Sequence, residues 1–127
     1  MIELEQTMPE IDRMVHEPAR LAILTVLASC ERADFLFLER VTGLTRGNLS
    51  VQLTRLEDAG LIEIEKTIYR KRTLTTASLA RPGRLALDCY WQSMDALRTH
   101  VQHVVEKPGK VGGPSRSPGR RAAAATS

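Results

Sequence analysis

The sequence predicts a mostly helical α+β domain with three helices, a two-stranded hairpin and a long final helix. Apolar residues recur at helical spacing up to Gly60, which favours helices in the first half of the chain. After Gly60, apolar and polar residues alternate with the period of two that is typical of a strand, and a second strand candidate follows a short basic stretch. Helical spacing returns at Pro82 and continues to Glu106.

The composition narrows the class of protein. The chain has 127 residues, of which 43% are apolar but only 4% aromatic, so we expect one domain with an aliphatic core. No uncharged apolar run of about 18 residues occurs, so no membrane partner or membrane-spanning helix is expected. The acidic start MIELEQTMPE lacks the pattern of a secretory signal. Cys30 and Cys89 have no metal-type spacing, and a small buried residue is favoured over a disulfide at each. We therefore expect a cytoplasmic protein.

The net charge of +3 is unevenly distributed. Residues 1–105 hold 13 basic and 14 acidic residues, whereas residues 106–127 hold five basic residues and one acidic residue. Within residues 40–72, however, seven basic residues stand against four acidic ones. Binding to a polyanion requires basic side chains that share one face, so their placement matters more than their total.

Local signals define the first elements. Residues 8–16 have apolar residues at helical spacing and are expected to form a short helix. Pro18 fits the first turn of a second helix, whose sequence ARLAILTVLAS is apolar nearly all round and therefore belongs at the centre of the core. Residues 30–33 should form a loop. Asp34 is a candidate N-cap for the helix FLFLERVT, which should end near Gly43.

Both ends of the next helix are specified by local chemistry. Thr45 is a favourable N-cap, and Gly60 is suited to the left-handed residue that ends a helix. Leu56 and Leu61 have the spacing of the apolar pair that accompanies a Schellman ending. The buried stripe of this helix is expected to consist of Leu49, Leu53 and Leu56.

The exposed face of that helix is unusual because it holds no acidic residue before Glu57. An ordinary solvated face would mix Glu and Lys. Short polar side chains and arginine can instead enter a DNA major groove, where they contact bases and phosphates. The residues predicted to contact DNA are Thr45, Arg46, Gly47, Asn48, Ser50, Val51, Gln52, Thr54 and Arg55.

A hairpin with a basic tip follows. Ile62, Ile64 and Ile68 alternate with polar residues and indicate a half-buried strand, and residues 73–79 provide its partner. The residues between them, 69–72, form the tip. Its basic residues could serve solubility alone, but contact with phosphate or the minor groove is favoured. The predicted contacts are Lys66, Arg70, Lys71 and Arg72.

The last helix, residues 82–106, carries a heptad seam. The seam either covers the core of its own domain or pairs with a second copy of the chain. Its length favours the second copy, so we predict a homodimer interface consisting of Leu87, Tyr90, Met94, Leu97, Val101 and Val104. Residues 8–106 thus form one domain, residues 1–7 are expected to be flexible, and residues 107–127 are expected to be a disordered basic tail.

Three strings carry a family resemblance: HEPARLAILTVLA, DFLFLERVTGLTRGNLSVQLTRLEDAGLIEIEK and RPGRLAL. Residues 16–85 resemble the winged helix-turn-helix DNA-binding domain of MarR/ArsR-like transcriptional regulators, in particular a compact winged helix subgroup. The resemblance implies that residues 45–59 are the recognition helix and that residues 66–73 form the tip of the hairpin, called the wing. Such proteins are typically dimers that associate through terminal helices. This chain departs from the family in having Gln52 where His is common.

The sequence thus predicts a double-stranded DNA-binding transcriptional regulator associated with the nucleoid. Repression is the simplest mode of action. A winged helix that serves only protein–protein interaction is the alternative, and a binder of structured RNA is a third. No enzyme activity or cofactor is expected, because no nucleophile–base pair or phosphate-binding loop stands out. His100 and His103 lack a third metal ligand, so no metal is expected either. A small-molecule effector is compatible with the sequence.

Overall fold

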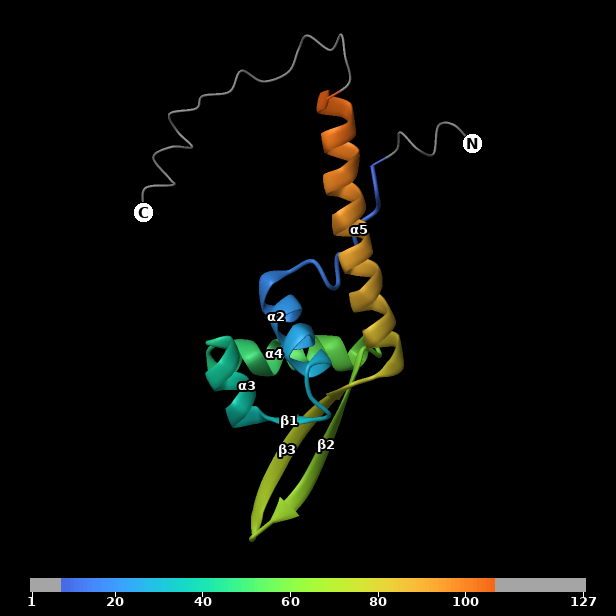
Figure 1. The fold of residues 1–127 in the computed structure, drawn as a ribbon. Coiled ribbons are helices and arrows are strands. Elements are labelled where there is room, and N and C mark those ends of the chain that lie inside the picture. The colour runs from blue at the N-terminus through green and yellow to red at the C-terminus, as the bar shows by residue number, and fades with distance from the viewer. Residues whose placement is uncertain (1–7, 107–127) are drawn as a thin grey trace, which may run out of the picture.

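The computed structural model describes residues 8–106, so the predictions for residues 1–7 and 107–127 lie outside the described residues. The predicted α+β class, with three helices, a two-stranded wing and a long C-terminal helix, is confirmed (Figure 1). In chain order the elements are α2 (Pro18–Ala28), β1 (Ala33–Asp34), α3 (Phe35–Thr42), α4 (Arg46–Asp58), β2 (Ile62–Tyr69), β3 (Arg72–Leu79) and α5 (Arg81–Glu106).

Residues 8–16 do not form the short helix that their apolar spacing predicts. Only Arg13–Val15 form a turn, in which the Asp12 carboxylate accepts a hydrogen bond from the Met14 N–H at 2.9 Å. This side-chain contact competes with helical pairing, and so short a segment has little helical stability of its own. Val15 is nevertheless fully buried, so the apolar pattern reflects contact with the core.

Helix α2 lies at the centre of the fold, as its apolar sequence predicts. Ile23, Leu24 and Leu27 are completely buried, and α2 contacts α3, α4, β3 and α5. Pro18 occupies its first turn, where the missing N–H has no intrahelical partner to lose. The Glu17 carboxylate caps the helix by accepting the Arg20 N–H at 2.8 Å. The other elements are therefore positioned around α2.

The sheet has three strands in the order β1-β3-β2, one more than predicted. Strand β1 falls in the segment that was expected to loop out, and Ala33 and Asp34 pair with Ala77 and Thr76. Two residues are too few to produce a periodic signal. Asp34 is also the N-cap of α3, where its carboxylate accepts the Phe37 N–H at 2.8 Å, as predicted. The strand therefore ties α3 to the base of the wing.

Helix α4 begins and ends as its sequence predicts. Thr45 Oγ1 accepts the Asn48 N–H at 3.1 Å. At the other end, the Leu61 N–H donates to the Leu56 carbonyl at 3.0 Å and the Gly60 N–H donates to the Glu57 carbonyl at 2.9 Å. Gly60 has a φ of 79°, so the complete Schellman motif is present. The direction in which the chain leaves α4 and enters the wing is therefore fixed.

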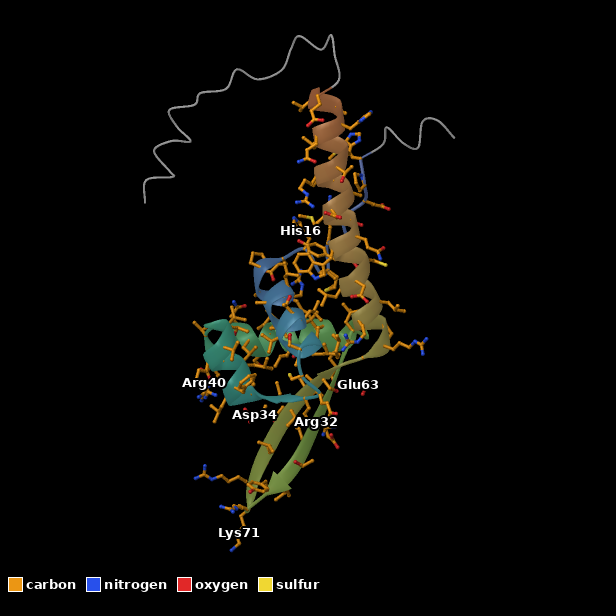
Figure 2. All side chains as sticks on the ribbon, viewed as in Figure 1. His16, Arg32, Asp34, Arg40, Glu63 and Lys71 are labelled. Carbon is orange, nitrogen blue, oxygen red and sulfur yellow. The ribbon has the colours of Figure 1, made fainter. Side chains whose placement is uncertain are left out.

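Helix α5 divides into two parts (Figure 1). In the first part, Leu87 and Tyr90 are buried in the core of their own chain, and Met94 packs against that core. The Tyr90 hydroxyl lies 2.9 Å from His16 Nδ1, which joins α5 to the turn before α2 (Figure 2). The prediction that Leu87 and Tyr90 form a dimer seam is thus wrong, because the core of the same chain already covers them. The second part of α5 extends beyond the body, and Val101 and Val104 are exposed there.

Candidate nucleic-acid interface

The structure places the acid-free face of α4 at the surface. Leu49, Leu53 and Leu56 are buried beneath it, as predicted. With one exception, the residues predicted to contact DNA are exposed: Thr45, Arg46, Gly47, Asn48, Ser50, Val51, Thr54 and Arg55. The helical spacing therefore separated the two faces of α4 at every predicted position except Gln52.

Gln52 is the exception, since only 8% of its surface is exposed. Its Oε1 accepts a hydrogen bond from Arg20 Nη1 at 2.9 Å, and its Nε2 donates to Asn48 Oδ1 at 3.0 Å. Both ends of the amide are engaged within the domain, so Gln52, which was predicted to contact DNA, does not lie on the exposed face of α4. The partner that draws it inward lies on α2, and no pattern within α4 could have revealed that contact.

The two arginines of α4 remain open to solvent. Arg46 Nη2 lies 3.8 Å from Glu39 Oε1, and 71% of the Arg46 side chain is exposed. An exposed ion pair at that distance is weak and does not prevent the guanidinium from reaching a phosphate. Arg55 is also exposed, in the last turn of the helix. Helix α4 therefore presents one positive charge near each end of its exposed face.

The wing carries three of its four basic residues at the end farthest from the core, and the fourth, Lys66, lies in the middle of β2. Lys66, Arg70, Lys71 and Arg72 are all exposed, and Lys71 lies at the far tip of the hairpin (Figure 2). Arg70 and Lys71 alone form the turn, because Tyr69 pairs with Arg72 as the last rung of the ladder. The tip is therefore shorter than the predicted residues 69–72, and β3 begins one residue earlier than expected.

Two apolar residues next to the tip were not identified as candidates from the sequence. Ile68 and Tyr69 are 79% and 58% exposed, because the hairpin extends past the body of the domain (Figure 1). The alternation of Ile62, Ile64 and Ile68 predicted one half-buried face, but burial falls from Ile62 towards the tip. The Arg70 guanidinium lies 5.3 Å from the Tyr69 ring centroid, which is a cation–π contact.

Other candidate groups are dispersed. Within residues 8–106, no three His, Cys, Asp or Glu side chains lie close enough together to hold a metal ion. Cys30 is half-buried, whereas Cys89 is exposed on α5 instead of buried as expected. None of the helices in the described part of the chain is long and apolar enough to cross a membrane.

Comparisons with known proteins agree with this geometry. A model of the winged helix DNA-binding domain matches residues 19–98. The uncharacterized protein MJ0432 of Methanocaldococcus jannaschii is 31% identical over 90 residues, which cover 71% of this chain and 98% of that protein. A transcriptional regulator homologue from Pyrococcus horikoshii OT3 is 28% identical and has a TM-score of 0.66, over 80% of this chain and 98% of the other.

A MarR-family transcriptional regulator from Silicibacter pomeroyi has the same fold at 19% identity, with a TM-score of 0.54 over 90% of this chain and 69% of the other. The proteins from Pyrococcus horikoshii and Silicibacter pomeroyi are both named for a role in transcriptional regulation. The helix-turn-helix of α3 and α4, the wing and the match over residues 19–98 lead to one conclusion. This chain belongs to the family of winged helix DNA-binding domains.

Proposed function

We propose that this chain regulates transcription by binding double-stranded DNA as a homodimer, with α4 in the major groove and the wing on the backbone or in the minor groove. The observation that carries the proposal is the exposed face of α4, which bears two arginines and short polar side chains but no acidic residue from Arg46 to Arg55. The basic turn of Arg70 and Lys71 supports it, because phosphate contacts fix the register of a protein on the duplex.

The second part of α5 supports the homodimer. Leu97, Val101 and Val104 continue the heptad spacing beyond the point where the core ends, and Val101 and Val104 are 45% and 41% exposed. A second copy of α5 is the occupant that a heptad stripe fits, since both helices then present the same spacing. Two recognition helices about 34 Å apart would contact successive major grooves of an inverted repeat. Bound at a promoter in the nucleoid, such a dimer would repress by excluding polymerase.

A binding experiment with random-sequence duplex DNA tests the proposal. The full chain should shift such a duplex at roughly 50 mM salt, and the affinity should fall steeply as salt rises because bound counterions are released. Single-stranded DNA and structured RNA of equal length are the controls, and both should bind more weakly. Absence of duplex binding at low salt would overturn the proposal and leave a module for protein–protein interaction.

A further inference from the structure

Three side chains form a chain of hydrogen bonds that runs from α2 to the exposed face of α4. Arg20 Nη1 donates to Gln52 Oε1 at 2.9 Å, and Gln52 Nε2 donates to Asn48 Oδ1 at 3.0 Å. Gln52 is buried, whereas Asn48 is exposed on the acid-free face. The contacts thus connect a fixed cation in the body of the domain to one candidate base-contacting residue.

The Arg20 side chain is fixed by further hydrogen bonds within the domain. Its Nε donates to the Met14 carbonyl at 2.7 Å, and its Nη2 lies 3.5 Å from the Arg13 carbonyl. Its backbone N–H donates to the Glu17 carboxylate that caps α2. The guanidinium is therefore fixed between the turn before α2 and the side chain of Gln52.

The donors and acceptors of Arg20, Gln52 and Asn48 permit only one orientation of the two amide groups. A guanidinium has only N–H donors, so the atom of Gln52 that faces Arg20 must be the carbonyl oxygen. The Gln52 amino group then points the other way, and the atom of Asn48 that faces it must be an oxygen. As a result, the Asn48 amino group is turned away from Gln52 and is available at the surface. An unconstrained asparagine could present either end.

We propose that Arg20 is a positioning residue which, through Gln52, makes Asn48 a hydrogen-bond donor to DNA and thereby selects guanine or thymine. This inference rests on the proposed placement of α4 in the major groove. An asparagine that pairs with adenine presents its oxygen and its amino group together, but here the oxygen is turned towards Gln52 and only the amino group faces outwards. A lone amino group can donate to guanine O6 or N7 and to thymine O4, whereas adenine offers only N7 beside its own amino group and cytosine presents an amino group.

The inference can be tested by letting the full chain select from a pool of random duplexes. About 24 base pairs are randomised, which is enough for two half-sites and the spacing between them. Wild type should prefer guanine or thymine over adenine by about fivefold or more at one position of each half-site. Asn48→Ala should remove the preference at that position only. Arg55→Ala is the matched control, and it should relax a different position.

Gln52→Glu provides the decisive variant. A glutamate still accepts from Arg20 but cannot donate to Asn48, so Asn48 should turn its amino group inward and its oxygen towards the DNA. The preference at that position should then change to adenine or cytosine. Arg20→Met, which removes the donors but keeps much of the apolar stem, should leave the position without a preference.

Three results would overturn the inference. Wild type could prefer adenine at the position that Asn48→Ala relaxes, or Asn48→Ala could relax no position at all. In the third, the Gln52→Glu protein would bind with lower affinity but keep the wild-type base preference. Thermal unfolding of each variant identifies any that fails to fold. If Arg20→Met fails to fold, the base preference of the Gln52→Glu protein alone decides whether the inference holds. Failure of wild type to bind any duplex would instead overturn the proposed function, and this inference with it.

Discussion

Gly83 lies in the first turn of α5, against the backbone of Leu61 between α4 and β2. A Cβ at this position would meet the Leu61 carbonyl oxygen and would lie 2.9 Å from both the Leu61 carbonyl carbon and Leu79 Cδ1. The Leu61 backbone cannot easily retreat, because its N–H completes the Schellman ending and its carbonyl accepts the Ala80 N–H at 3.0 Å. A glycine is therefore required at this crossing of α5 over Leu61.

We expect Gly83→Ala to lower the free energy of unfolding by about 3 kcal/mol, since overpacking against fixed backbone is costly. Urea unfolding at one protein concentration would measure the change. Gly47→Ala is the matched control, because a Cβ at Gly47 would meet no atom within 4 Å. A Gly83→Ala protein as stable as wild type would show that α5 can move away from Leu61.

Gly47→Ala should itself separate stability from binding. Alanine in a helix is favoured over glycine by up to about 1 kcal/mol, so this variant should be slightly more stable than wild type. Its methyl group would stand on the exposed face of α4, at the second residue of the helix, where the proposed complex brings backbone near DNA. Duplex affinity measured by titration should fall. An unchanged affinity would place the DNA farther from this turn.

Several single residues whose partners are local were predictable from the sequence. Asp34, Thr45 and Gly60 each act on backbone groups within five residues, so the sequence alone identified the caps and the helix end. Gln52 was not predictable in this way. Its position relative to the surface depends on Arg20, which lies 32 residues earlier in the chain.

At the scale of elements, the turn of the wing is unusual because neither of its two residues is glycine. Arg70 and Lys71 have φ values of 54° and 66°, in the left-handed region that a type I′ turn requires. Asn-Gly is the preferred pair in such a turn, and left-handed backbone costs other residues about 1 kcal/mol or more each. The chain therefore retains two positive charges at the tip despite their conformational cost.

We expect the double variant Arg70→Asn with Lys71→Gly to raise the free energy of unfolding by about 1–2 kcal/mol and to weaken DNA binding. If both basic side chains contact phosphate, the slope of log affinity against log salt should decrease by about two. Urea unfolding and duplex titrations at several salt concentrations would measure the two effects. Unchanged affinity and slope would show that the tip does not touch DNA.

Long elements were predictable from periodicity, whereas short or composite ones were not. Helices α2, α3 and α4 and the strands of the wing follow the expected spacing closely. Strand β1 contains two residues and exists only because β3 pairs with it. The heptad seam of α5 is continuous in sequence, but spacing alone cannot show where the core of the same chain stops covering it. That boundary lies near Met94.

At the scale of the whole molecule, α5 and the wing extend from opposite ends of the body (Figure 1). The wing ends in exposed basic residues, whereas the far part of α5 ends in exposed valines. Charge is suited to DNA and an apolar stripe to protein, so the two extensions fit the two contacts of the proposed dimer. The central core of α2 connects them, because it contacts both α5 and β3.

The dimer can therefore be tested in the intact chain without disturbing the core. Val101→Asp with Val104→Asp would place two carboxylates on the exposed stripe of α5, beyond the residues that pack on the body. In a symmetric dimer each substitution occurs twice, so we expect the variant to lose about 3 kcal/mol of association free energy. A loss of that size weakens the dimer roughly a hundredfold. Sedimentation should show a monomer with unchanged unfolding behaviour, and affinity for an inverted repeat should fall towards that for a single half-site. Val41→Asp, at an exposed valine of α3, is the matched control and should leave the dimer intact. An undiminished dimer in the α5 variant would show that the chain associates through another surface.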